Sequence, residues 1–350
     1  MRSQQGRRVL ITGIAGQLGG QLAARLEADD DVAYLAGLDL HEPRHDLTRT
    51  EYVRADLRSP LVAKLVEDAR VDTIVHLDIT ATPADAGGRT RMKERNVLGT
   101  MQLLGAAQRC PGVARVVVKS TTAVYGSTYT NPALLREESA PDAAVHRGYG
   151  KDAVEVESYA RAFGRRRADV ALTVLRFANF IGPNAQTPLT SYLALPAVPT
   201  VLGFDPRVQL CHETDAVEVL YRAARGDHPG IFNVAGPGIV YLSQAIRLAG
   251  RVSVPVPPPF VGGVAGLVRR AGRIDVTPDQ LAFLTYGRVA DISRLREHFG
   301  YEPAYSTRAA LADFLASGRV SPVVDPETLT RVEQRVHGLL TRTAARGSAT

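Results

Sequence analysis

Short apolar runs alternate with amphipathic segments along the first half of the chain. Residues 8–12 form a continuous apolar run, typical of a strand that is buried on both faces of a parallel sheet. A glycine-rich segment follows, and a helical pattern then continues to about Asp30. Because this strand-then-helix rhythm repeats as far as Phe177, we expect an α/β fold with a doubly wound parallel sheet.

Two periods of hydrophobic residues define the expected elements, one of two residues for strands and one of 3.6 residues for helices. Further strands are expected at 33–38, near 52–53, and at 73–77, 113–119, 170–177 and 231–234. Helices are expected from about Leu22 to Asp30 and at about 60–69, 92–109, 148–165, 242–251 and 261–270.

The rhythm breaks after Ile181, where prolines punctuate a stretch that we expect to be rich in loops. A proline-rich linker is expected at 254–260. We assign residues 1–180, with about 206–240, to a nucleotide-binding domain. Residues 181–205, with about 241–325, are assigned to a smaller, interleaved substrate-binding lobe, and 326–350 to a peripheral tail.

The glycine-rich segment matches the pattern G-x-x-G-x-x-G between a strand and a helix. One glycine allows a tight turn, one allows the backbone to approach a pyrophosphate, and one allows helix and strand to pack closely. The start of the following helix offers unpaired N–H groups to phosphates. This is typical of a dinucleotide site in a Rossmann fold, and the predicted contacts are Gly13, Ala15, Gly16, Gln17, Leu18 and Gly19.

The carboxylate of Asp39 is expected at the end of the second strand, about 20 residues after the glycine loop. A carboxylate there can accept hydrogen bonds from the adenosine ribose and repels a 2′-phosphate, which favours NAD over NADP. Arg44 lies close behind and could pair with a phosphate, so the prediction is NAD(P)H with a preference for NAD. The alternative role for Asp39 is to cap a turn.

With these residues placed, the chain resembles the extended short-chain dehydrogenase/reductases, near the UDP-glucose 4-epimerase branch, over roughly residues 8–320. The segments that carry the resemblance are 12–19, 75–77, 96–100, 120–126 and 175–183. Asp78 departs from it, because a small residue is usual there. The resemblance implies further cofactor contacts at Asp56, Leu57, Leu77 and Ser120.

The resemblance also implies that Thr121 and Tyr149 are the catalytic residues, but the Tyr-x-x-x-Lys pattern of the family is incomplete. Ala153 stands where the family has lysine, which binds the nicotinamide ribose and lowers the pKa of the tyrosine. Lys151 is no simple replacement, because residues two apart on a helix point to different faces. A tyrosine without a nearby cation is protonated at neutral pH and can serve as an acid but poorly as a base.

This asymmetry favours reduction over oxidation. We therefore expect an NAD(P)H-dependent ketoreductase, similar to the atypical ketoreductases of actinobacterial antibiotic pathways, acting on a ketone such as that of an aromatic polyketide. The proton would come from Tyr149, from water or from the substrate. Expected substrate contacts are Thr122, His146 and Asn179. The alternatives are a sugar-nucleotide epimerase or dehydratase with altered catalysis, and a dinucleotide-binding sensor without turnover.

The second half weakens the sugar-nucleotide alternative. Relatives on that branch carry an arginine four residues before a histidine, whereas here Arg207 precedes His212 by five residues. An offset of one residue reverses the face of a strand, although Arg207 could still reach a phosphate from a loop. Apolar residues that could line a cavity include Leu189, Tyr192, Leu193, Leu195, 257–260 and Leu284; the alternative for each is core packing.

Composition narrows the choice of partners. The net charge is +6, but nearly all of the excess is arginine, a pattern typical of coding bias, so we expect no nucleic-acid partner. Cys110 and Cys211 are far apart, and a proline separates His41 from His45, so neither a disulfide framework nor a metal site is predicted.

No apolar run spans a membrane, and residues 9–12 are too short for a signal-peptide core, which favours a cytoplasmic protein. By analogy with the family, we expect a homodimer formed through helices 92–109 and 148–165.

Overall fold

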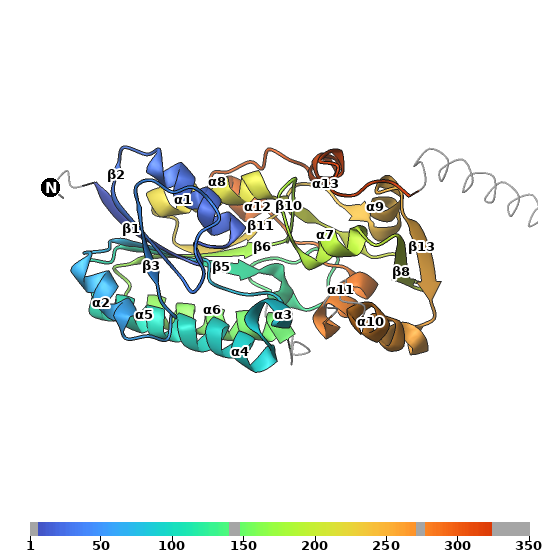
Figure 1. Ribbon diagram of the computed structural model, residues 1–350, viewed down its shortest axis with the longest axis horizontal. Helices are drawn as coiled ribbons and strands as arrows, with labels where there is room; N and C mark the ends of the chain where they lie inside the picture. Colours follow the sequence, from blue (N-terminus) through green and yellow to red (C-terminus); the bar gives the residue numbers. More distant parts are fainter. Residues whose placement is uncertain (1–5, 140–147, 271–276, 324–350) are drawn as a thin grey trace, which may run out of the picture.

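A seven-stranded parallel sheet forms the centre of the computed structural model, which describes residues 6–139, 148–270 and 277–323 (Figure 1). The strand order is β11-β6-β5-β4-β1-β2-β3, and every neighbouring pair is parallel. The expected doubly wound α/β fold is confirmed. The strands are β1 (Arg7–Thr12), β2 (Val32–Asp39), β3 (Thr50–Arg54), β4 (Thr73–His76), β5 (Arg115–Thr121), β6 (Ala171–Phe177) and β11 (Gly230–Val234).

Helices cover both faces of this sheet. On one face lie α1 (Gln17–Glu27) and α8 (Glu213–Arg225), and on the other lie α2 (Leu61–Asp68), α5 (Thr100–Arg109) and α6 (Gly148–Arg166) (Figure 1). Each helix buries one apolar stripe against the strands: Leu22 and Leu26 of α1 and Val156 and Phe163 of α6 are at most 2% exposed. The sheet order reverses direction between β1 and β4, so a crevice opens at the carboxyl ends of these strands.

The helix that the sequence predicts at 92–109 is not a single α-helix. It consists of α4 (Arg89–Lys93), a π turn (Glu94–Gly99) and α5. Asn96 of the π turn is fully buried, and its side-chain amide exchanges two hydrogen bonds with the backbone of Thr80, at 2.8 and 2.9 Å. The wider turn thus ties the loop after β4 to this helix, beside the crevice. A short helix, α3 (Pro83–Ala86), precedes it.

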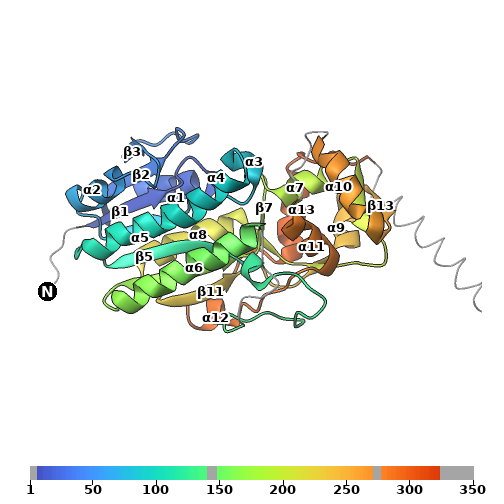
Figure 2. The same ribbon diagram turned by 90° about the horizontal axis from the view of Figure 1, so that it is seen from below.

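Much of the chain after β6 forms a lobe at one end of the sheet, whereas α8 and β11 belong to the main sheet and its layers (Figure 2). Three two-stranded sheets lie in this part of the chain: β7 (Asn179–Ile181) with β10 (Leu210–His212), β9 (Arg207–Val208) with β12 (Val240–Tyr241), and β8 (Ala197–Val201) with β13 (Val252–Val256). The helices of the lobe are α7 (Pro188–Leu193), α9 (Leu242–Leu248), α10 (Val261–Arg270), α11 (Pro278–Tyr286) and α13 (Thr307–Ala316), whereas α12 (Ser293–Glu297) packs against β11 of the main sheet. Leu193, Leu210, Phe283 and Phe314 belong to a shared apolar core, separate from those of the main sheet.

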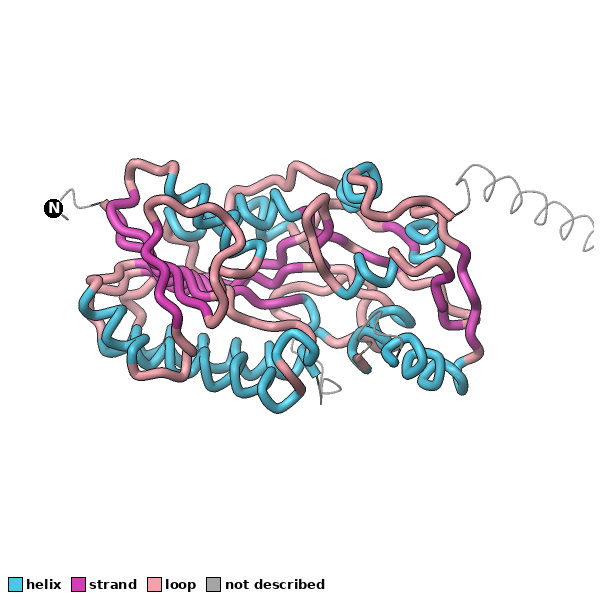
Figure 3. The backbone as a smooth tube through the Cα atoms, in the orientation of Figure 1, coloured by secondary structure: helices cyan, strands magenta, loops and turns pink. Residues whose placement is uncertain are grey.

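One expectation for the second half is wrong: the segment 254–260 is no linker, because the end of β13 and a 3-10 turn (Pro258–Phe260) occupy most of it (Figure 3). The stretch after Ile181 is rich in loops, as expected, with α7 and β8 between them. Pro255 is tolerated in β13 because this strand pairs with β8 alone, so the missing N–H costs no bond on its open side. The expected tail at 326–350 and His146 lie outside the described residues.

Candidate active site

The glycine loop joins β1 to the start of α1. Gly13 has a left-handed φ of +77°, and a side chain on Gly19 would collide with the carbonyl oxygen of Gly13. Gly16 caps α1 without a side-chain hydrogen bond, and the first turn of the helix carries no acidic residue. The N–H groups of this turn are therefore open to an anion, and the loop fits the diphosphate of a dinucleotide.

A long cavity runs along the carboxyl ends of the strands, beginning at the glycine loop. We call it the dinucleotide cavity. Its walls come from β1, β2, β4, β5 and β6 and the loops after them. The predicted cofactor residues that line it are Gly13, Ala15, Gly16, Asp39, Leu77 and Ser120, and Gln17, Leu18 and Gly19 line an adjoining pocket at the glycine loop.

Asp39 lies at the end of β2 and is 3% exposed. Its carboxylate accepts hydrogen bonds from the backbone N–H groups of Ala15 and His41, each at 3.1 Å. The guanidinium of Arg95 lies 3.5 Å from the same carboxylate. Asp39 therefore braces the glycine loop from within the dinucleotide cavity, and its hydrogen bond to a ribose stays a prediction.

Three predicted cofactor residues have other partners. The carboxylate of Asp56 pairs with Arg58 at 2.7 Å, which lowers the pKa of that carboxyl group, and Asp56 is not among the residues lining the dinucleotide cavity. Leu57 is 1% exposed and belongs to the apolar core under α2 and α5. The Ser120 hydroxyl group donates a hydrogen bond to Glu157 at 2.6 Å, although Ser120 also lines the dinucleotide cavity.

The two predicted catalytic residues meet. Tyr149 lies at the start of α6 and Thr121 at the end of β5, and both line the dinucleotide cavity and a second cavity beside it. Burial raises the pKa of Tyr149 to about 12, and the charge of Asp152 raises it further, while Thr121 and Arg288 act in the opposite direction. The phenol is therefore protonated at neutral pH.

Ala153 does not face an unfilled space that a lysine would occupy. It is 1% exposed and packs in an apolar cluster with Val124, Tyr125 and Leu135. Lys151 is partly buried and is not among the residues lining the dinucleotide cavity. Neither position supplies a cation to the phenol.

The first turn of α6, which carries Tyr149, is fixed from two sides. Asp279 of α11 accepts a hydrogen bond from the backbone N–H group of Gly150 at 3.2 Å. Burial raises the pKa of the Asp279 carboxyl group, and the backbone of Tyr149 acts in the opposite direction. Arg89 of α4 binds both carboxylate oxygens of Asp152 at 2.6 Å and the carbonyl oxygen of Gly148 at 3.1 Å. Helix α11 of the lobe therefore caps the helix that presents the phenol.

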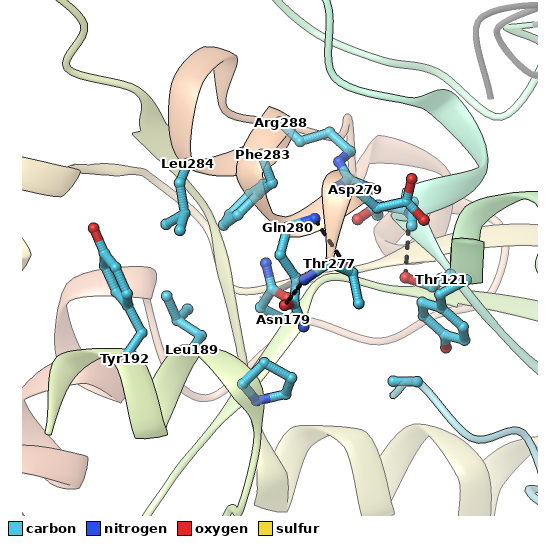
Figure 4. A pocket seen from close by; sticks show the side chains of 15 residues that line it. Thr121, Asn179, Leu189, Tyr192, Thr277, Asp279, Gln280, Phe283, Leu284 and Arg288 are labelled. Atoms are coloured by element: carbon cyan, nitrogen blue, oxygen red, sulfur yellow. Dashed lines mark hydrogen bonds between the residues drawn. The ribbon is translucent and has the colours of Figure 1, made fainter. Parts of the chain in front are cut away.

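A second cavity, the lobe cavity, opens from the dinucleotide cavity toward α7 and α11 (Figure 4). Thr121, Tyr149 and Asn179 line both cavities, which marks their junction. Figure 4 shows Leu189, Tyr192, Phe283 and Leu284 on one side of the lobe cavity and Thr121 with Asp279 on the other. The predicted substrate residues Thr122 and Asn179 both line it.

Arg288 is the cation of the lobe cavity and follows α11. Burial lowers the pKa of its guanidinium to about 10, and its Nε finds no hydrogen-bond partner among the described residues. The guanidinium carbon lies 5.3 Å from the centre of the Phe283 ring. A cation held in this way favours a ligand that carries an anionic group at this end.

A chain of charged groups along the dinucleotide cavity was not predicted as a site. Asp78 forms an ion pair with Arg95 at 2.6 Å, and Arg95 reaches on to Asp39. Lys119 projects into the same cavity from β5. Two features of the sequence could have indicated this group: Asp78 stands where a small residue is usual, and Lys119 directly follows the apolar residues Val116–Val118. Nothing in the sequence pattern indicated Asp279 or Arg288, because they come from the distant lobe.

Arg176, which matches the family segment, belongs to the core. It is 1% exposed and binds Glu157 through two nitrogen atoms, at 2.8 and 2.7 Å, and the Tyr125 hydroxyl group at 2.7 Å. Arg207 is not among the residues that line the lobe cavity. Over the described ranges, no helix is long and apolar enough to cross a membrane.

Comparisons with known proteins agree with this geometry. Residues 9–235 match the NAD dependent epimerase/dehydratase family. An uncharacterized protein of Mycobacterium tuberculosis is 42% identical over 342 residues, which are 97% of this chain and 91% of that protein. UDP-glucuronic acid decarboxylase 6 of Arabidopsis thaliana is 25% identical over 88% of each chain. Among solved structures, UDP-glucose 4-epimerase of Thermotoga maritima with UDP-glucose has a TM-score of 0.68 at 19% identity, over 89% of this chain and 98% of the other.

Proposed function

This chain belongs to the NAD-dependent epimerase/dehydratase family, and from that premise we propose that it is an NADH-dependent ketoreductase. The substrate would carry its ketone to the junction of the two cavities, where Thr121, Tyr149 and Asn179 meet. A bound reduced nicotinamide would supply the hydride. The preference for NADH over NADPH rests on the Asp39 carboxylate, which would oppose a 2′-phosphate.

The protonation state of Tyr149 carries this proposal. A phenol with a pKa raised to about 12 is a proton donor at neutral pH, whereas oxidation of an alcohol needs a base. In the reduction, the carbonyl carbon gains the hydride, the C=O π bond breaks, and the oxygen takes the proton of Tyr149. The Thr121 hydroxyl group would hold the same oxygen, and solvent would return a proton to the phenol.

The apolar wall of the lobe cavity supports a substrate with a ring system beside its ketone, such as an aromatic polyketide. Leu189, Phe283 and Leu284 offer such a ring contact area without polar groups to satisfy. A phenol of the substrate itself could serve as the proton donor in place of Tyr149.

The second candidate is conversion of a sugar nucleotide, and Arg288 favours it. Its Nε lacks a partner among the described residues, and a diphosphate or a sugar carboxylate would give it one. The relatives also support this candidate, since their names refer to UDP-glucose and UDP-glucuronic acid. Removal of a hydrogen from the sugar would, however, require a base that Tyr149 supplies poorly.

Thermal unfolding with NADH, NADPH, UDP or UDP-glucose, each added separately, distinguishes the candidates. A ligand that binds only the folded chain raises the unfolding midpoint in line with its concentration and affinity. We expect stabilisation by NADH and none by UDP. Stabilisation by UDP would overturn the ketoreductase in favour of the second candidate. Binding of NADH without reduction of any ketone in a broad panel would point to a dinucleotide sensor.

The role of Tyr149 is tested by Tyr149→Phe, which removes the proton donor and keeps the ring. We expect ketone reduction, followed as NADH absorbance at 340 nm, to fall by about 10²- to 10⁴-fold, the usual contribution of a positioned acid. Binding of NADH should change little. If reduction continues at a similar rate, the proton comes from water or from the substrate.

A further inference from the structure

Lys119 is a charged residue of the dinucleotide cavity to which the reaction above gives no role. It lies on β5 two residues before Thr121, and residues two apart on a strand point to the same face. Its side chain lines both the dinucleotide cavity and the adjoining pocket of the glycine loop. It therefore stands between the place for a diphosphate and the pair Thr121 and Tyr149.

The ammonium group of Lys119 is incompletely satisfied by the protein. It donates one hydrogen bond, to the carbonyl oxygen of Ile79 at 3.0 Å. Among the described residues, no carboxylate oxygen lies within 4.0 Å of it, because Asp78 pairs with Arg95 instead. Two of its three N–H donors can thus serve a ligand in the cavity.

Burying the charge of Lys119 costs free energy of folding, and the packing of β5 does not require a lysine there. The surrounding walls remove solvent and lower the pKa of Lys119 to about 8, against the attraction of Asp78. An apolar residue would suit the strand better, since Val116, Val117 and Val118 directly before it are all buried. A ligand with hydroxyl groups would satisfy the remaining donors.

We propose that Lys119 positions the dinucleotide by donating hydrogen bonds to the ribose of its nicotinamide half, which Ala153 cannot do from α6. The other cations of the cavity lie elsewhere: Arg95 is paired with Asp78 near Asp39, and Arg44 follows β2. The chain would then keep a cation for cofactor binding, while no lysine among the described residues lowers the pKa of the phenol and Arg288 lowers it only in part. This inference rests on the proposed function only in assuming that a dinucleotide binds.

Binding of three nucleotides of increasing length locates the contact. ADP consists of adenosine and the diphosphate. ADP-ribose adds the second ribose, and NADH adds the nicotinamide ring to that ribose. In Lys119→Met, we expect the Kd for ADP-ribose and for NADH to rise by about 10- to 100-fold, as for loss of a hydrogen bond to a charged group, with the Kd for ADP unchanged. Calorimetric titration measures all three.

Two further variants test whether the loss of affinity comes from misfolding or from removing any lysine. Lys119→Gln keeps a donor for Ile79 and should fold as the wild type does, while still losing affinity for ADP-ribose. Lys151→Met is the matched control, because it removes a lysine of α6 that does not line the cavity, and it should leave all three Kd values unchanged. The unfolding midpoint without ligand checks that each variant folds.

Each other outcome overturns the assignment. If Lys119→Met weakens the binding of ADP as much as that of ADP-ribose, Lys119 contacts the diphosphate. If it weakens the binding of NADH alone, Lys119 contacts the nicotinamide ring. If no affinity changes, Lys119 takes no part in binding. The ketoreductase proposal is tested separately. If the chain binds ADP-ribose through Lys119 but reduces no ketone, the role of Lys119 is supported and the ketoreductase proposal is wrong.

Discussion

At the scale of single residues, we propose that two tasks attributed to one lysine in the related enzymes, binding the nicotinamide ribose and lowering the pKa of the tyrosine, are separated in this chain. Tyr149 keeps its proton because burial and Asp152 raise its pKa to about 12, against a modest effect of Arg288. Lys119 is a cation on the other side of the junction and is not among the groups that shift the pKa of Tyr149. If Lys119 binds the cofactor as proposed, cofactor binding and activation of the phenol are uncoupled in this chain.

The first prediction concerns stability and pH at Lys119. Burial lowers the pKa of its ammonium group from 10.5 to about 8 on folding, with a smaller contribution from the charge of Arg95 and against the attraction of Asp78. Between these values the unfolded chain binds more protons, so the cost of burying the charge is complete below pH 8 and vanishes toward pH 10.5. We expect Lys119→Met without ligand to be more stable than the wild type at pH 7, by roughly 1–3 kcal/mol.

Urea unfolding of both proteins at pH 7 and pH 10 measures this difference. The advantage of Lys119→Met should narrow at the higher pH, because the wild-type lysine then loses its charge. Other groups titrate in this range but are common to both proteins, so only the difference is interpreted. A variant that is less stable than the wild type at pH 7 would show that the hydrogen bond to Ile79 outweighs the buried charge.

The second prediction concerns the missing lysine. Ala153→Lys restores the family pattern but places a long charged side chain in the apolar cluster of Val124, Tyr125 and Leu135. We expect a loss of about 2–4 kcal/mol in stability, from overpacking and burial of a charge, and no gain of alcohol oxidation. The assay is NADH formation from an alcohol with NAD. Oxidation that rises without loss of stability would contradict this account of the cluster.

At the scale of elements, the lobe holds the phenol in place through a helix cap. The third prediction is that Asp279→Ala, which removes the acceptor for the N–H group of Gly150, costs about 1–2 kcal/mol in stability. It should also lower kcat for ketone reduction more than it weakens NADH binding, because α6 loses its fixed start. Steady-state kinetics and calorimetry separate the two effects.

A matched control for this cap is Asp205→Ala. Asp205 accepts hydrogen bonds from the backbone and side chain of Ser243 at the start of α9, in the lobe and outside both cavities. It should cost a similar amount of stability and leave kcat unchanged. Equal effects of the two variants on kcat would mean that Asp279 contributes only to folding.

The expected homodimer is also argued at this scale. Met101 of α5 is 37% exposed, Leu98 of the preceding π turn is 41% exposed, and Tyr159 of α6 is 39% exposed. We propose that these helices pair with a second copy of the chain, which would cover the apolar side chains. The fourth prediction is that Met101→Glu shifts the mass in solution from dimer to monomer by light scattering, whereas Leu61→Glu on α2 does not. A monomeric wild type would overturn the proposal.

At the scale of the whole molecule, the sheet and the lobe contribute different walls to one reaction site. The dinucleotide cavity lies mainly at the carboxyl ends of the strands, and the lobe cavity lies mainly against α7 and α11. A ligand that fills both would link the lobe to the sheet (Figure 4). Under the proposed function, the lobe would select the substrate and the sheet would position the cofactor.

The sequence by itself determined the sheet and the glycine loop, because both depend on local patterns. Apolar runs define buried strands, and a glycine triplet between a strand and a helix has few other uses. The choice of Thr121 and Tyr149 followed from the resemblance, and both residues line the junction of the two cavities.

Only the tertiary structure decided the surroundings of that pair. Asp279 and Arg288 come from a lobe about 130 residues later in the chain. A role for Lys119 could be inferred only once the structure placed it in the same pocket as the glycine loop. The proline-rich segment 254–260 was mistaken for a linker because an isolated two-stranded sheet leaves little periodic signal. Contacts between distant segments set the pKa values and the charges of the site, because the electric field at a side chain depends on what packs against it and not on its neighbours in sequence.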